Sequence, residues 1–303
     1  MSIATTTEPE SVVKPSGQSH KPENQGHGRY VYCIIDRNEP QMPGTAENNS
    51  MASGNLGAIG VGQDHPEVFV IRHQDVGAVI SATSCDKYDI SRENVLAHQR
   101  VMEAVMQHGH TALPVRFNTI AKDKNGRSAE CRIVEHVLIN RLEEFSSLLG
   151  AMSTRVELGV KALWTNMKSV FAEIVDSDER IKQLREKLLV VSQAPPSRRP
   201  GNVMTAQIKL GEMVKDALEA KKLEAEERLT AVLRPFIVDL KKNKPFGDTM
   251  FANLALLVEE SSQAKIISAL STFEAEASRQ VKLKCVGPVP PSNFIELVIT
   301  WDD

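Results

Sequence analysis

The stretch 156-VELGVKALW-164 alternates apolar and other side chains more strictly than any other part of the chain. Successive side chains of an extended backbone point to opposite faces, so its apolar residues share one face. That face carries Val156, Leu158, Val160, Ala162 and Trp164, opposite Glu157, Gly159 and Lys161. The pattern predicts a half-buried β-strand, the clearest one in the sequence.

A helical excursion is predicted directly after this strand, at about residues 166–243. Apolar residues such as Ile174, Ile181 and Leu188 recur there with the three- and four-residue spacings typical of a coiled coil. A proline-rich turn separates this stretch from a second one, which Pro235 should end at Arg234. We expect two long helices that pack as an antiparallel hairpin.

Shorter elements return after the excursion. Apolar patterns predict a strand at residues 254–258, a helix at 261–278, and alternating strands at 281–285 and 295–301. The resulting order is strand, helical excursion, strand, helix, strand, strand, close to a ferredoxin-like arrangement. We therefore predict that residues 151–303 form a C-terminal ferredoxin-like domain with a long, coiled-coil-like helical insertion.

Before the 156–164 strand, the sequence predicts a separate N-terminal α+β domain at residues 29–150. A short aromatic and β-branched run at residues 30–35 indicates a strand buried on both faces, and runs near 68–71 and 78–82 indicate a hairpin. Helices should follow, one capped by Ser91 and one from about Ser128 to Gly150. Residues 1–28 are rich in Thr, Ser, Pro and Glu, and we expect a disordered tail.

Composition restricts the class of protein. The 303 residues are 41% hydrophobic, and 36 Lys and Arg against 39 Asp and Glu leave a net charge of −3. This balance excludes a polybasic nucleic-acid binder, and no apolar run reaches the roughly 20 residues that span a bilayer. The N-terminus lacks the pattern of a secretory signal, so we expect a cytoplasmic protein with four reduced cysteines and no membrane partner.

Catalytic and ligand motifs are missing from the sequence. It contains no P-loop, G-x-S-x-G or H-E-x-x-H motif, and Gly57-x-x-Gly60-x-Gly62 departs from the dinucleotide fingerprint. We interpret that glycine segment as a flexible loop rather than a phosphate cradle. His98 lies on the apolar stripe of its helix, which favours a hydrogen-bonded core histidine over a metal ligand. We predict no enzyme activity, cofactor or metal.

Arg116 stands between apolar Val115 and Phe117, just after a proline. Such an arginine could grip a carboxylate ligand through two parallel hydrogen bonds. The alternative is an internal ion pair that joins the strand to a helix, and we prefer it. In that case Arg116 should matter for folding more than for chemistry.

Several motifs together resemble one family. They are Tyr30-Val31-Tyr32-Cys33-Ile34, the His98 helix, Leu113-Pro114-Val115-Arg116-Phe117-Asn118-Thr119, the 156–164 strand, and Gly287-Pro288-Val289-Pro290-Pro291-Ser292-Asn293-Phe294. In this order, from about residue 29 to the end, they resemble the gas vesicle proteins GvpF and GvpL. The chain departs at Asn118, where the family usually has glycine.

The resemblance implies a cytoplasmic accessory protein that supports assembly of the gas vesicle, a hollow protein shell that gives buoyancy. Its expected partners are the small hydrophobic shell protein and other accessory proteins of the vesicle. The matching motifs mark Arg116, Phe117, His98 and Trp164 as candidate structural or partner-binding residues.

Two alternatives stay open at this point. A coiled-coil scaffold would need only the helical arms, and truncating the arms would then abolish every partner interaction. A small-molecule enzyme would use Arg116 as an anion clamp, and a ligand would then raise the melting temperature.

Overall fold

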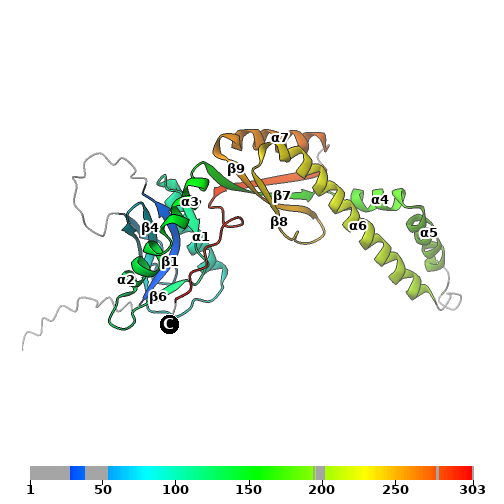
Figure 1. Cartoon of the computed structure of the whole chain (residues 1–303). Helices are drawn as coiled ribbons and strands as arrows, with labels where there is room; N and C mark the ends of the chain where they lie inside the picture. The colour runs from blue at the N-terminus through cyan, green and yellow to red at the C-terminus, as the bar shows by residue number, and fades with distance from the viewer. Residues whose placement is uncertain (1–27, 38–53, 194, 196–201, 278–279, 302–303) are drawn as a thin grey trace, which may run out of the picture.

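The structure is a computed structural model and describes residues 28–37, 54–193, 195, 202–277 and 280–301. Figure 1 shows two regions built of sheet and helix, with a helical arm that extends away from the second. The chain is therefore an α+β protein, as predicted, and its two sheets are antiparallel. Residues 1–27 of the expected tail lie outside the described residues, whereas Gly28 already belongs to the first strand.

Within the described residues, six strands form the first sheet, in the order β2-β3-β4-β1-β5, with β6 also paired to β1. They are β1 (Gly28–Asp36), β2 (Asn55–Ala58), β3 (Glu67–His73), β4 (Val76–Thr83), β5 (Ala112–Pro114) and β6 (Ile120–Lys122). The predicted hairpin is confirmed as β3 and β4. Its two-residue turn holds Gln74 at φ +51°, a left-handed conformation that suits such turns.

Helices cover both faces of the first sheet. One face packs against α1 (Arg92–Gln107), and the other against α2 (Ala129–Ile133), the π-helix η1 (Val134–Ile139) and α3 (Leu142–Met152). Ser91 and Ser128 cap their helices as predicted, because each hydroxyl accepts a hydrogen bond from a backbone N–H three residues on. The second helix is not continuous: the π-helical turn interrupts it before Arg141.

Strand β1 is buried on both faces, as its sequence predicts. Every residue from Tyr30 to Ile35 is fully buried. A bulge between Val31 and Cys33 shifts the register with β4. Because of the bulge, Tyr32 and Cys33 both contribute to the core under α1, whereas Val31 and Ile34 contribute to the core under α3.

Four strands form the second sheet within the described residues, all antiparallel, in the order β10-β7-β9-β8. They are β7 (Arg155–Trp164), β8 (Asp239–Lys242), β9 (Met250–Glu259) and β10 (Val281–Val289). The 156–164 strand is thus confirmed as a central strand. Strand β8 is not predicted, because its charged residues show no apolar alternation.

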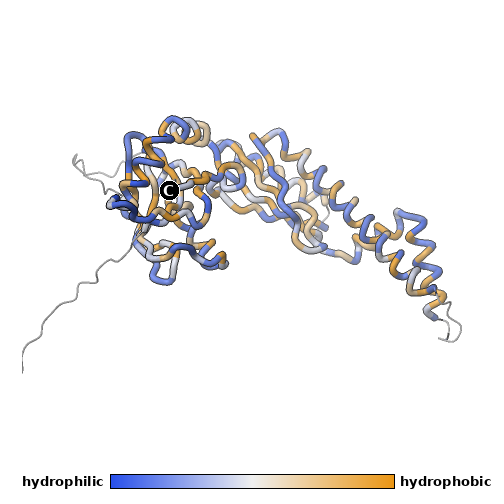
Figure 2. Tube along the Cα trace, turned by 60° about the horizontal axis from the view of Figure 1, so that its bottom comes forward, coloured by the Kyte–Doolittle hydropathy of each residue, from blue (hydrophilic) through white to orange (hydrophobic). Residues whose placement is uncertain are grey.

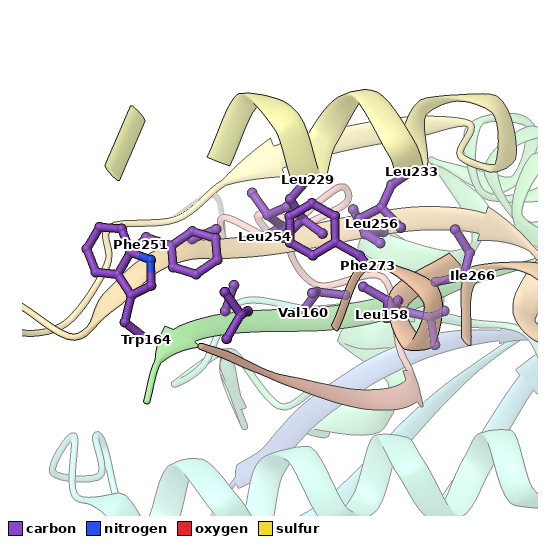
Figure 3. Packing of buried hydrophobic residues seen from close by; sticks show 14 of the residues in the cluster. Leu158, Val160, Trp164, Leu229, Leu233, Phe251, Leu254, Leu256, Ile266 and Phe273 are labelled. Carbon is purple, nitrogen blue, oxygen red and sulfur yellow. The ribbon is translucent and has the colours of Figure 1, made fainter. Parts of the chain in front are cut away.

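One face of the second sheet is covered by α6 (Val203–Leu233) and α7 (Gln263–Glu276), which follows the short η4 (Glu260–Ser262). Figure 3 shows this core: Leu158 and Val160 of β7 lie beneath Leu229 and Leu233 of α6, with Phe273 of α7 beside them. The alternating apolar residues of β7 are therefore buried together on one face, as their pattern predicts. Glu157, Gly159 and Lys161 lie on the opposite face.

The helical arm consists of α4 (Met167–Ser177) and α5 (Glu179–Gln193), which pack against the much longer α6. The expectation of one continuous first helix is wrong, because Asp178 has an extended backbone (φ −117°, ψ 106°). Helix α6 ends at Leu233, and η3 (Arg234–Phe236) holds Pro235, as predicted. Hydrophobic positions recur along the arm in Figure 2. Ile181 and Leu218 are buried, and Leu229 of the same seam packs over the second sheet.

The alternating residues 295–301 do not form a strand of the second sheet, which corrects that prediction. Leu297 forms a single parallel bridge with Val115, at the edge of the first sheet. Ile295, Ile299 and Trp301 pack against the core under α3. The red end of the ribbon in Figure 1 accordingly lies on the first-sheet region. We call residues 290–301 the C-terminal strap, because they run from β10 back to the first sheet.

Candidate partner-binding residues and surfaces

His98 lies in a cluster of aromatic side chains between α1 and the first sheet. Its Nδ1 is 3.0 Å from the Tyr30 hydroxyl, and its ring stacks on Tyr32 at 5.6 Å between centroids. Burial lowers the pKa of His98 to about 4, although a hydrogen bond to the Val115 backbone acts in the opposite direction. The imidazole is therefore neutral near pH 7, in the environment of a hydrogen-bonded core histidine.

Phe117 belongs to the same cluster. Its ring lies edge-on to His98 at 5.7 Å and to Tyr30 at 6.1 Å, an arrangement that aromatic quadrupoles favour. The next residue, Asn118, has φ +68° and donates its backbone N–H to the Tyr30 hydroxyl at 3.1 Å. Its side chain also exchanges two hydrogen bonds of 2.8 Å with the Tyr88 backbone. These bonds support the left-handed backbone of Asn118, a conformation that asparagine tolerates better than most residues.

The glycine loop closes over this cluster. The Gly60 N–H donates to the Pro66 carbonyl at 3.0 Å, and the Val61 N–H donates to the Tyr32 hydroxyl at 2.9 Å. A Cβ at Gly60 would lie 2.7 Å from the Pro66 oxygen, so only glycine fits this close approach. Because both amides are already bonded within the protein, they do not form a phosphate cradle.

Arg116 lies where the strap meets the first sheet. Its backbone N–H donates to the Leu297 carbonyl at 3.0 Å, and the Leu297 N–H donates to the Pro114 carbonyl at 2.8 Å. The Arg116 guanidinium donates to one carboxylate oxygen of Glu296 at 3.2 and 3.3 Å. Both side chains are about half exposed, at 55% and 53%. Arg116 thus forms an ion pair, as the preferred interpretation predicts. Its partner lies on the strap rather than on a helix, and the pair is half exposed rather than internal.

The other end of the strap is held by Glu157, a residue that sequence reasoning did not single out. The Glu157 carboxylate accepts hydrogen bonds from the Asn293 backbone N–H at 2.9 Å and from its side-chain amide at 2.5 Å. Burial raises the pKa of Glu157, while these two bonds oppose the rise. Gly287 passes close by, since a Cβ there would lie 2.8 Å from the Glu157 carbonyl oxygen. Glu157 therefore ties the strap to β7 through its two hydrogen bonds with Asn293.

Trp164 is separate from the other three candidates. It is buried at the end of β7, and its ring centroid lies 5.2 Å from that of Phe251. The two side chains lie beside each other in Figure 3. The structure thus brings His98, Phe117 and Arg116 together around one loop and places Trp164 in the other core. Two open hollows of about 510 and 640 Å³ lie elsewhere, and none of the four candidates lines them.

The surface offers a different candidate at the far end of the arm. Leu189 and Val190, near the end of α5, are 48% and 71% exposed, and Met204 and Ile208, near the start of α6, are 73% and 55% exposed. We call these four residues the arm-tip patch. They lie off the buried seam, so the heptad-like pattern does not predict them.

Among the described residues, no group of three or more His, Cys, Asp or Glu side chains could hold a metal ion. In the same part of the chain, no helix combines the length and apolarity that crossing a bilayer requires.

Comparison with known proteins gives a consistent result. The family model described as "Gas vesicle synthesis protein GvpL/GvpF" matches residues 28–296. Gas vesicle protein L1 of Halobacterium salinarum is 24% identical over 283 residues, which cover 88% of this chain and 90% of the relative. Gas vesicle protein F of Dolichospermum flosaquae is 21% identical over 215 residues, covering 70% of this chain and 80% of that protein.

Two solved structures share the fold. The crystal structure of GvpF from Anabaena sp. superimposes with a TM-score of 0.65 at 20% identity, covering 88% of this chain and 98% of that one. GvpF from Microcystis aeruginosa gives a TM-score of 0.61 at 18% identity, covering 89% of this chain and 100% of that one. The similarity therefore includes both sheets.

Proposed function

Because this chain belongs to the GvpL/GvpF family of gas vesicle synthesis proteins, we propose that it is an accessory protein that binds the small hydrophobic shell protein and supports vesicle assembly. It acts in the cytoplasm, at the growing vesicle, by protein–protein contact and without turning over a substrate. A shell subunit with a large apolar face would aggregate before assembly unless that face is temporarily covered.

The arm-tip patch is the observation that carries this proposal. Val190 and Met204 each expose more than two thirds of their surface, at 71% and 73%, on an arm that projects away from both sheets. The four residues lie in the last turns of α5 and the first turns of α6, so apolar surface is exposed at one end of the arm. The patch is thus suited to an apolar partner.

Pairing at the β5 or β8 edge is the less favoured mode for the shell protein. At the first sheet, the strap bridges Val115 beside the β5 edge. At the second sheet, β8 is only four residues long, and Asp239, Lys241 and Lys242 are exposed on it. Short and charged edges discourage strand addition.

The architecture that presents the patch is, in our interpretation, a ferredoxin-like domain with a helical insertion. The second region follows the order strand, helices, strand, strand, helix, strand, and its sheet order is β10-β7-β9-β8. The arm falls between the first and second strands of this unit. We infer that the domain serves as a base and the arm as the part that reaches the partner.

The two alternative functions receive less support. An anion clamp at Arg116 would compete with Glu296, which already occupies the guanidinium. A pure coiled-coil scaffold would give the two sheets no role. The sheet regions, however, contain more of the described chain than the arm does.

Co-expression with the shell protein tests the proposal. We expect the full chain to raise the soluble fraction of the shell protein and to co-purify with it. A Val190→Glu/Met204→Glu variant should lose both effects, whereas Ile90→Glu/Ile267→Glu, at positions 79% and 55% exposed outside the arm, should retain them. Apolar contact should persist at about 1 M salt, where the Debye length falls to about 3 Å.

Two results would contradict the proposal. Shell protein that is equally soluble with and without this partner, with no co-purification, would remove the binding function itself. Full binding by the Val190→Glu/Met204→Glu variant would show that the surface lies elsewhere.

A further inference from the structure

The second sheet has a row of lysines on the face that turns away from α6 and α7. Lys284 of β10 lies directly opposite Lys161 of β7, and Lys161 lies opposite Asn253 of β9. The Asn253 side chain donates to the Lys244 carbonyl at 3.2 Å, so the backbone of the exposed Lys244 passes the end of the row. Lys282 follows on the same face of β10. All four lysines are exposed.

These four lysines lack carboxylate partners in the part of the chain that the structure describes. By contrast, Lys221, Lys222 and Lys242 pair with Glu173, Glu219 and Glu226 around the arm. The Glu157 carboxylate is already bonded to Asn293. Glu274 of α7 lines a hollow together with Lys282, and no ion pair joins them. The lysine face is therefore a local excess of positive charge on a chain whose net charge is −3.

Protection of the sheet edge explains only part of this arrangement. Lysines on an edge strand discourage unwanted pairing, which would account for Lys282 and Lys284. Lys161 lies on the central strand β7, where it protects no edge. Two like charges directly opposite on neighbouring strands destabilise a sheet. The pair Lys161–Lys284 thus has a cost that a bound anion would remove.

We propose that the lysine face and the adjacent edge of β10 bind an extended acidic segment of a partner protein. Strand β10 ends the sheet, so its outer backbone groups are available to an added strand along Val281–Val286. Backbone hydrogen bonds would hold the segment, and carboxylates at alternate positions would meet Lys282, Lys284 and Lys161. This surface is separate from the arm tip, and the proposal stands or falls independently of shell-protein binding.

A labelled peptide of about ten residues that alternates Glu and Thr is the probe, with an alternating Gln and Thr peptide as its neutral counterpart. The full chain should bind the acidic peptide at low salt, and binding should weaken as salt is raised. Lys161→Gln/Lys282→Gln/Lys284→Gln should weaken binding about tenfold. Lys187→Gln/Lys209→Gln/Lys215→Gln, which removes the same charge from exposed arm positions, should leave it unchanged.

Thermal unfolding gives a second measurement on the same variants. Because the lysine-face variant relieves like-charge repulsion, its melting temperature should equal or exceed that of the unaltered chain. A lysine-face variant that binds the acidic peptide more weakly, but unfolds at an equal or higher temperature, therefore supports the proposal. Equal weakening by both triple variants would indicate net charge alone and overturn it. Tighter binding of an oligonucleotide of equal charge would also overturn it, as would no binding of the acidic peptide.

Discussion

The two sheets differ in how completely they are covered. The first has helices on both faces, and the strap adds to its edge, so that β1 is buried from Tyr30 to Ile35. The second has helices on one face only, while its other face carries exposed lysines and the anchored end of the strap. The second region, unlike the first, therefore leaves one face of its sheet open to solvent.

The same contrast extends to the titrating groups inside each region. In the first, His98 is held neutral by burial among aromatic rings. In the second, Glu157 is held by Asn293 while burial favours its protonated form. Acidification should therefore weaken one region and strengthen the other, and the following predictions use this difference.

The largest effect is expected from His98. Its pKa is lowered from 6.5 to about 4 in the folded chain, so the unfolded chain binds more protons between these values. The free energy of unfolding should fall as the pH drops from about 6.5 to 4, by about 3 kcal/mol in total. Chemical denaturation of His98→Gln at several pH values should lack this fall, and an unchanged pH slope would contradict it.

A smaller effect of opposite sign is expected from Glu157. Its pKa is raised above the ordinary value of 4.5, so the folded chain binds the proton more tightly than the unfolded chain. Its contribution to stability is therefore present at low pH and is lost as the pH rises through the raised value. In Glu157→Gln this downward slope should disappear, as chemical denaturation at several pH values would show. Lys161→Gln, on the same strand face, serves as the control.

The smallest effect is expected from Arg116. From the sequence, Arg116→Ala should lower the soluble yield, because a buried guanidinium would lose its partner. The side chains of Arg116 and Glu296 are instead 55% and 53% exposed, and an exposed ion pair contributes about 0 to 1 kcal/mol. Arg116→Ala should thus unfold within about 1 kcal/mol of the unaltered chain, in denaturant titration at neutral pH. A loss of several kcal/mol would restore the original expectation.

Local chemistry explains why much of the fold could be predicted from the sequence. The 156–164 strand, the cap at Ser91 and the helix end before Pro235 each depend on a few neighbouring residues. The predictions fail where a distant contact decides. An alternating pattern at 295–301 shows that one face is apolar, but it does not show which core that face joins.

The candidate residues follow the same rule. The apolar stripe on its helix was sufficient to place His98 in a core, whereas the partner of Arg116 is 180 residues away and leaves no local pattern. Glu157 could have been noticed as the acidic member of the face opposite the apolar side of its strand. Its role in holding the strap depends on Asn293, which is 136 residues away and leaves no local pattern.

The strap also has a consequence for the order in which the protein is made. Leu297 completes a core whose other members, such as Val31 and Phe145, leave the ribosome far earlier. Chains generally fold by region as they emerge, starting from the N-terminal end. Here the first region must wait, with the place of Leu297 unfilled, until the whole second sheet and its arm have been synthesised. The first region can therefore complete its core only after the second region has been synthesised.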